Sequence, residues 1–301
     1  MSSSFKKLLL LSILFFLLVG CSINSKYGNT PTNHKLIAYK VENERGQHLY
    51  VLGTIHAGEV ERYPFREEIE SAFDESDYFA VEIDVTSTEN VVMDMKANAI
   101  KDLNVSEDAL AHLKKVSETY PKTVSRLTMS YDNLLNYNAF TIESLMGTAA
   151  ISKLGHSSTY GIEYYFLDKA KHENKEIVEM EGPTYQVDLM QELNKSYADF
   201  MLRHLLSYED SVSTYEKETQ FVLDGDVESL INIMYPKNDN SREQGYYDAF
   251  IFNRNDTMTN LAKEYIASGD TYFIAVGAGH VIGERGIIQQ LEQQGYKVTR
   301  L

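Results

Sequence analysis

The sequence predicts an α/β protein in which a central mixed, largely parallel sheet is flanked by helices and a helical middle forms a cap. Three observations lead to this prediction. Strand-like apolar segments lie near both ends of the chain, amphipathic helical segments separate them, and residues 91–267 are mostly helical in pattern. Because neither end holds enough strands to form a stable sheet by itself, we expect the two ends to build one sheet together.

The first 20 residues have the pattern of a lipoprotein signal peptide. Two lysines precede an apolar run from Leu8 to Val19, which has the length of a signal-peptide core and is short for a membrane span. Residues 18–21 (LVGC) then resemble a lipobox, and Cys21 is the only cysteine. We predict cleavage before Cys21 and its acylation, which would anchor the mature chain to the lipid bilayer at the extracytoplasmic face of the cell membrane. The alternative is an ordinary buried or free cysteine.

Residues 21–34 are polar and turn-prone, so we expect a short lipid-anchored tether before one domain of residues 35–301. The domain begins with a predicted hairpin. Lys35–Val41 alternates like a strand, Glu44–Gln47 supplies the turn, and His48–Leu52 returns as the second strand.

A helix and a third strand follow the hairpin. Apolar residues at helical spacing predict a short helix that begins near Pro64 and ends near Phe73. Asp77–Val85 is rich in aromatic and branched residues, which indicates a buried strand. The strand, helix, strand order with nearly continuous apolar strands predicts parallel pairing.

The middle of the chain predicts the helical cap. Residues 91–138 and 139–174 are helical in pattern, with a loop at Gly155–Gly161, and Lys175–Met180 is a short strand. Apolar residues at steps of three and four from Leu189 to Tyr208 then predict one long amphipathic helix, and further helix extends to residue 267.

The C-terminal segment repeats a pattern found near the N-terminus. Thr271–Val276 is a buried-type strand, Gly286–Gln294 a helix and Tyr296–Leu301 a final strand. Both HLYVLGTIH and YFIAVGAGH are an apolar strand that ends in Gly-x-x-His, with the motif glycines at Gly53 and Gly277.

Charge and cysteine content exclude several classes of function. Acidic residues outnumber basic ones 44 to 28, which gives a net charge of −16. A surface this negative repels phosphate backbones, so we expect no nucleic-acid partner. One cysteine excludes a disulfide framework and a thiolate metal cluster.

The repeated motif predicts a functional site. A histidine just past the carboxyl end of a buried strand lies at the crevice where open α/β sheets bind ligands. If the two strands are neighbours, His56 and His280 share one edge of the sheet. There they either bind a divalent metal or act as general acid and base.

Two carboxylates and an arginine extend this candidate site. Glu82 and Glu181 each end an apolar strand, where a carboxylate is costly unless it is paired or used. Two histidines and a carboxylate form the ligand set of many catalytic zinc sites, and the set equally suits manganese or cobalt. Asp84 is the alternative to Glu82 as the functional acid. Arg254 is a candidate for holding a substrate carboxylate or an oxyanion.

These motifs, taken in order, resemble the TraB/GumN (TraB/PrgY/GumN) family, which includes the animal TIKI proteins, over Lys35 to Leu301. The matching positions are residues 52–56, Glu82, residues 161–163, Glu181 with Gln186, Arg254 with Asn255, and residues 276–280. The resemblance implies a fold similar to the erythromycin-esterase and ChaN-like proteins. It also implies a site built from the two motif histidines, a glutamate and an arginine.

Two functions follow from this reasoning. One is a metal-dependent, peptidase-like hydrolase in which His56, Glu82 and His280 hold manganese, cobalt or zinc. Glu181 or Asp84 would then be the general base. The other is a non-catalytic protein that binds and sequesters small hydrophobic, pheromone-like peptides. The substrate or ligand is a peptide in both.

Overall fold

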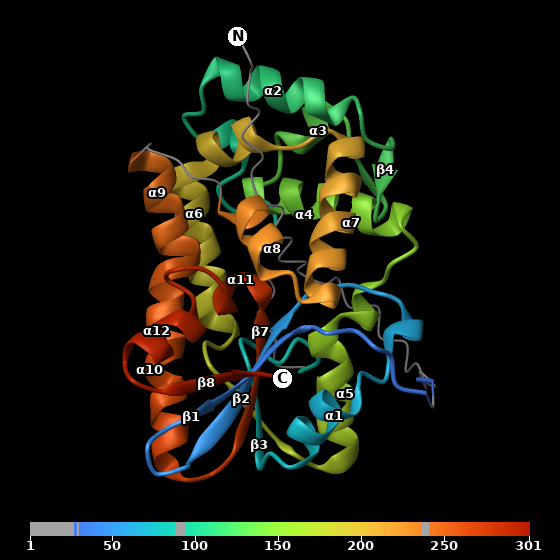
Figure 1. The fold of residues 1–301 in the computed structure, drawn as a ribbon. Helices are drawn as coiled ribbons and strands as arrows, with labels where there is room; N and C mark the ends of the chain where they lie inside the picture. Colours follow the sequence, from blue (N-terminus) through green and yellow to red (C-terminus); the bar gives the residue numbers. More distant parts are fainter. Residues whose placement is uncertain (1–26, 29, 88–93, 236–240) are drawn as a thin grey trace.

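Segments from both ends of the chain, together with one strand from its middle, build one six-stranded sheet (Figure 1). The computed structural model describes residues 27, 28, 30–87, 94–235 and 241–301. The strands are β1 (Ile37–Glu42), β2 (His48–Thr54), β3 (Tyr78–Val81), β6 (Glu176–Glu179), β7 (Tyr272–Gly277) and β8 (Lys297–Arg300). Their order is β6-β3-β7-β2-β1-β8. The predicted α/β class is therefore confirmed.

The four strands at the middle and one edge of the sheet are parallel. β7 pairs with β2 on one side and with β3 on the other, and β6 continues the sheet beyond β3. β2 and β3 run in the same direction, but β7 lies between them, so the predicted pairing of these two strands is wrong. This arrangement brings the carboxyl ends of β2, β3, β6 and β7 to the same edge.

The predicted hairpin forms the antiparallel part of the sheet. β1 pairs with β2, and β8 adds to β1 as an antiparallel edge strand. The side chain of Asn43 holds the turn, because its Oδ1 accepts hydrogen bonds from the backbone N–H of Arg45 at 2.9 Å and of Gln47 at 3.1 Å.

Helices cover both faces of the sheet (Figure 1). On one face lie α1 (Glu67–Asp74) and α5 (Ile162–Glu173), and on the other α10 (Asn253–Ser268) and α12 (Ile287–Gln293). Phe73 of α1 and Phe166 of α5 pack against Phe273 of β7, with ring centroids 5.5 and 5.0 Å apart. Between β7 and α12 lies the short α11 (Ala278–Val281), which contacts β2.

The middle of the chain forms a helical cap with a hydrophobic cluster of its own. Its helices are α2 (Glu107–Ser117), α3 (Tyr131–Leu134), α4 (Ala139–Lys153), α6 (Pro183–His204), α7 (Tyr208–Asp224), α8 (Val227–Met234) and α9 (Ser241–Tyr247). A π-helical turn, Asp248–Phe252, leads into α10. In Figure 1 the cap stands above the sheet, while α7 and α8 also pack on the core of the sheet.

Several predicted boundaries differ from the structure. The helix expected from Pro64 begins at Glu67, because Arg66 is extended and serves as its N-cap. β3 ends at Val81 rather than at Val85. The helix expected to reach Tyr208 ends at His204, because Leu205 is extended and the Ser207 hydroxyl caps a separate helix, α7.

Residues 91–138 are less helical than expected. Two short strands, β4 (Thr123–Val124) and β5 (Leu127–Thr128), form a hairpin there. Its turn residues Ser125 and Arg126 both have positive φ, a conformation that no helix accommodates. Short 3₁₀ helices lie at Ile100–Asp102 and, elsewhere in the chain, at residues 60–62 and 158–160.

The predicted signal peptide and Cys21 lie outside the described residues. The described part of the predicted tether contacts the domain: Thr32 N–H donates to the Pro64 carbonyl at 2.9 Å, and the Tyr27 ring packs against Tyr63 and Tyr165. Among the helices of the described segments, none combines the length and the apolar character needed to cross a membrane.

Candidate functional site

The two Gly-x-x-His motifs lie side by side. In the β2–β7 pair, Gly53 faces Val276 and Thr54 faces Gly277, so His56 and His280 follow neighbouring strands at the same edge of the sheet. The predicted placement of the two histidines is confirmed, while their functional role stays a prediction. A Cβ on Gly53 would lie 3.1 Å from the Ala278 Cα, so the glycine allows α11 to pack directly on β2.

Gly277 marks the point where the candidate site residues meet. A Cβ on this glycine would lie 3.4 Å from Glu82 Oε1, 3.7 Å from His280 Cδ2 and 4.0 Å from His56 Nε2. Three chemically active side chains therefore surround one space, which we call the Gly277 space. No side chain of residue 277 itself fills it, because that residue is a glycine.

Glu82 directly follows β3 and is held at both oxygens. Its Oε1 accepts the backbone N–H of Gly277 at 2.8 Å and lies 3.8 Å from His280 Nε2. Its Oε2 accepts hydrogen bonds from Arg254 at 2.5 Å and from Gln186 of α6 at 3.2 Å. The carboxylate thus faces the Gly277 space with one oxygen and a fixed cation with the other.

Arg254 links the two predicted glutamates. Its Nε and Nη2 donate to the two oxygens of Glu181 at 2.6 and 2.8 Å, and Nη1 donates to the Phe250 carbonyl at 3.1 Å. The residue is only 1% exposed. Arg254 therefore acts within the protein as the counter-charge of Glu82 and Glu181, and its guanidinium is not open to a substrate.

The carboxylate of Glu181 is likewise fully engaged. Both of its oxygens accept hydrogen bonds from Arg254, and Oε2 also accepts one from Gln186 at 2.8 Å. Asp84 lies elsewhere, because its carboxylate accepts from Thr86 and pairs with Lys171 at 3.2 Å. Both expected general bases are thus engaged with other side chains of the protein.

His56 is oriented by a residue that the motif reasoning did not assign to the site. Its Nδ1 lies 2.7 Å from Oε1 of Glu163, which lies in the first turn of α5 and also accepts the Thr54 hydroxyl at 2.5 Å. A Cβ on Gly161 would lie 2.6 Å from the His56 carbonyl, so that glycine lets α5 approach the strand end. The side chain of His56 is 30% exposed, the most of the five predicted site residues.

His280 is buried and oriented in a similar way. Its Nδ1 lies 2.6 Å from Oδ1 of Asn255, and the Asn255 amide donates to the Arg285 carbonyl at 2.9 Å. Asn255 is completely buried and follows Arg254 in α10. Glu163, Asn255 and Gln186 occur in the motifs that carry the family resemblance, and that was the only signal for them in the sequence.

The surroundings shift the two histidines in opposite directions. Burial lowers the pKa of His56, but the Glu163 and Glu82 carboxylates outweigh burial and raise that pKa to about 9. Burial and the Arg254 charge lower the pKa of His280 to about 3. Burial raises the pKa of Glu82, yet the neighbouring histidine and Arg254 charges bring it down to about 2. The site therefore holds a neutral His280 beside an ionised Glu82.

The donor set suits a divalent cation in its chemistry. The carboxylates of Glu82, Glu163 and Glu181 meet one guanidinium, which leaves two negative charges when both histidines are neutral. Two imidazole nitrogens and a carboxylate oxygen are common ligands of zinc and manganese. Within the described segments, however, no three His, Cys, Asp or Glu side chains are grouped closely enough to form a metal site as they stand.

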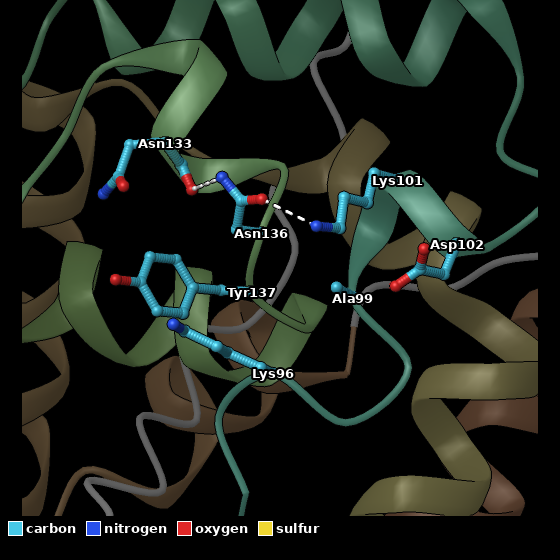
Figure 2. Close-up of a pocket in the computed structure, with 7 residues that line it drawn as sticks. All are labelled: Lys96, Ala99, Lys101, Asp102, Asn133, Asn136 and Tyr137. Carbon is cyan, nitrogen blue, oxygen red and sulfur yellow. Dashed lines mark hydrogen bonds between the residues drawn. The ribbon is translucent and has the colours of Figure 1, made fainter.

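A separate pocket of about 340 Å³ lies in the cap and shares no residue with this site (Figure 2). It is lined by Lys96, Ala99, Lys101, Asp102, Asn133, Asn136 and Tyr137. Lys101 donates to the Asn136 side chain at 2.9 Å. The lining is mostly polar, so this pocket is not the hydrophobic peptide groove that a sequestering protein would need.

Comparison with known proteins identifies relatives. The chain is 23% identical to the Escherichia coli protein YbaP, itself uncharacterized, over 81% of this chain and 88% of that protein. It is 27% identical to a protein named Metalloprotease TIKI homolog from Amphimedon queenslandica, over 45% of this chain and 32% of the sponge protein. The search of solved structures finds no match.

The sequence profile of the TraB/PrgY/gumN family matches residues 37–300. That range includes every strand of the sheet, both Gly-x-x-His motifs and all the residues that surround the Gly277 space. The chain belongs to the TraB/PrgY/gumN family.

Proposed function

We propose that this chain is a hydrolase that cleaves peptides with the help of a divalent metal ion, which is manganese, cobalt or zinc. One observation carries the proposal: His56 Nε2, a ring carbon of His280 and Glu82 Oε1 all lie within 4.0 Å of one point beside Gly277. When both histidines are neutral, as binding of a metal through their ring nitrogens requires, the site has two uncompensated negative charges, which favour a cation of charge +2.

The residues of the site divide into two groups in this proposal. The cation would be held by His56, His280 and Glu82. Arg254 fixes the second oxygen of Glu82, and Glu181 in turn fixes Arg254. A bound divalent cation would lower the pKa of a water molecule and polarise the scissile carbonyl. The substrate would approach from the side of His56, because that side chain is exposed whereas His280 is buried.

Two of the comparisons support the proposal. The name of the sponge relative includes the word metalloprotease, and the aligned region covers 45% of this chain. The family match adds that the ordered motifs belong together. Neither names a substrate or a metal for this chain, so the choice of a peptide and of these metals remains part of the proposal.

Metal content and peptide cleavage test this function. The full-length chain, purified in detergent, would be compared with the His56→Ala/His280→Ala double variant and with His172→Ala, a surface histidine whose side chain is 78% exposed. We expect about one metal ion per wild-type chain, cleavage of a peptide library, and loss of both in the double variant alone. A metal-free chain that binds hydrophobic peptides without cutting them would instead establish a sequestering protein.

We also propose that acylation of Cys21 anchors the chain outside the cell. The support is the sequence alone: an apolar run that ends at a lipobox-like motif with the only cysteine. In a Cys21→Ala variant we expect the acyl mass to disappear and the chain to move from the membrane fraction. Wild-type protein without an acyl group would overturn this part.

A further inference from the structure

Each of the two motif histidines has the same ring nitrogen held by a side chain from a different helix. His56 Nδ1 lies 2.7 Å from Glu163 of α5, and His280 Nδ1 lies 2.6 Å from Asn255 of α10. The two partners are chemically different and come from opposite faces of the sheet. What they share is an oxygen directed at Nδ1.

We propose that Glu163 and Asn255 are positioning residues that keep a proton on Nδ1 of both histidines, so that Nε2 of each ring is the atom available toward the Gly277 space. The arrangement itself stands apart from the proposed function, but its consequence for metal binding rests on that function. In metal sites, the hydrogen bond made by the second ring nitrogen fixes the tautomer and orientation of the ligand.

The orientation of the Asn255 amide determines the tautomer of His280. Asn255 Nδ2 donates to the Arg285 carbonyl at 2.9 Å, so the nitrogen end of the amide must point there. Oδ1 then faces His280, and a carbonyl oxygen only accepts hydrogen bonds. His280 Nδ1 must therefore carry the proton. In the neutral form of this ring, Nε2 is then left with a lone pair.

Glu163 leads to the same result at His56. In its ionised form this carboxyl only accepts hydrogen bonds. Its Oε1 receives the Thr54 hydroxyl and faces His56 Nδ1. The contact with Thr54 at the end of β2 fixes the carboxylate to the strand that leads to the histidine. Nδ1 of His56 is thus a donor.

Side-chain ¹H–¹⁵N NMR of histidine-labelled full-length protein in detergent tests the arrangement without metal or substrate. We expect protonated Nδ1 in both rings and an unprotonated Nε2 in His280. In Glu163→Ala the NMR signal of the hydrogen-bonded Nδ1–H of His56 should disappear, while the corresponding signal of His280 stays. In Asn255→Ala the His280 signal should disappear and the His56 signal should stay. Glu163→Gln should retain the His56 signal, because the amide oxygen still accepts.

Glu70→Gln is the matched control. Glu70 has the same side-chain exposure as Glu163, 15%, and also accepts a buried hydroxyl, that of Tyr165 at 2.9 Å. This variant should leave both histidine signals unchanged. Titration with zinc should then show about a 10- to 100-fold weaker affinity in Glu163→Ala and Asn255→Ala, but not in Glu70→Gln.

The outcomes separate the two proposals. Wild-type His280 with its proton on Nε2, or Nδ1–H signals that survive both alanine substitutions, would overturn the positioning role whether or not metal binds. Should the alanine variants fail to fold, the wild-type and Glu163→Gln spectra still decide. Correct tautomers in a chain that takes up neither zinc, manganese nor cobalt would refute the metal proposal and leave the positioning role standing.

Discussion

Gly277 and Gly53 occupy matching places in the two motifs, yet a side chain would have different effects at each. At Gly277 a Cβ meets its neighbours at 3.4 Å or more, which is ordinary contact. We expect Gly277→Ala to fold normally, with a change of less than about 1 kcal/mol in unfolding free energy. Because the methyl group occupies the space shared by His56, Glu82 and His280, we also expect at least a tenfold loss in metal affinity and kcat/KM.

Gly53→Ala should show the opposite pattern. Its Cβ would lie 3.1 Å from the Ala278 Cα and 3.3 Å from the Ile37 Cβ, so β2 and α11 must separate slightly. We expect a loss of about 1–3 kcal/mol in urea unfolding. Metal affinity, measured at urea concentrations well below the unfolding midpoint of the variant, should change less than in Gly277→Ala. Equal loss of metal affinity in both variants would show that the Gly277 space is not where the ion binds.

Replacement of Arg254 should destabilise the fold, because two buried glutamates then lose their cationic partner. Arg254→Met leaves Glu82 and Glu181 in the interior without their counter-charge, and we expect a loss of about 3–5 kcal/mol in unfolding free energy. Arg203→Met, which breaks an ion pair with Asp199 on the exposed side of α6, should cost less than about 1 kcal/mol. A similar result for both variants would mean that the two glutamates are neutral in the fold.

The sequence predicts the residues that follow strands better than their partners. His56, Glu82 and His280 are found because each comes at or just past the end of an apolar strand, where local pattern and chemistry coincide. Glu163 is 107 positions from His56, and nothing in its own segment indicates that α5 begins at the end of β2. Its role depends on tertiary packing through Gly161, so local pattern alone does not reveal it.

At the level of elements, α7 carries a buried acid that makes stability depend on pH. Glu218 is 7% exposed and its Oε1 has no hydrogen-bond partner, and burial raises its pKa from 4.5 to about 8. The folded state keeps this proton up to about pH 8, whereas the unfolded chain releases it near pH 4.5. Its stabilising effect is therefore complete below pH 4.5 and is lost as pH rises toward 8, by at most about 1.4 kcal/mol per pH unit.

Glu218→Gln should remove the part of this dependence that Glu218 contributes, while Glu143 of α4, whose pKa burial also raises to about 8, keeps its own part. We expect the variant to gain a few kcal/mol over wild type at pH 8 and little at pH 5, in urea unfolding followed by circular dichroism. Glu216, which is exposed on the same helix, supplies the control, because Glu216→Gln should keep the wild-type slope. Parallel slopes for wild type and Glu218→Gln would show that the carboxyl is already ionised in the folded state.

Most elements could be predicted from the sequence, but their order in the sheet could not. The strand pattern at Thr271–Val276 is as clear as that at His48–Leu52, and both are strands in the structure. β7 lies between β2 and β3 because of long-range strand pairing, which the periodicity of a single segment does not indicate. The β4–β5 hairpin could not be predicted for a local reason. Its turn residues with positive φ are Ser125 and Arg126, whereas glycine or asparagine usually marks this conformation in a sequence.

At the scale of the whole molecule, the site depends on segments from every part of the chain. β2 and β3 come from the N-terminal part, Glu163 and Glu181 from the middle, and Arg254 and His280 from the C-terminal part. The cap has its own hydrophobic cluster, yet α6 reaches from it to the site through Gln186. The site can therefore form only after the distant segments have come together, and its metal affinity should report on the complete fold.

The net charge of −16 predicts how peptides approach this site. A negative field attracts cationic ligands and speeds their association, and salt screens it within about 10 Å at 0.1 M ionic strength. We expect kcat/KM, or the association rate if the chain only binds, to be about tenfold higher for a lysine-containing peptide than for its glutamate-containing counterpart at low salt. The difference should shrink severalfold at 0.5 M salt, while an uncharged peptide stays unaffected. A preference that persists at high salt would place the discrimination in direct contacts near His56 rather than in the field of the molecule.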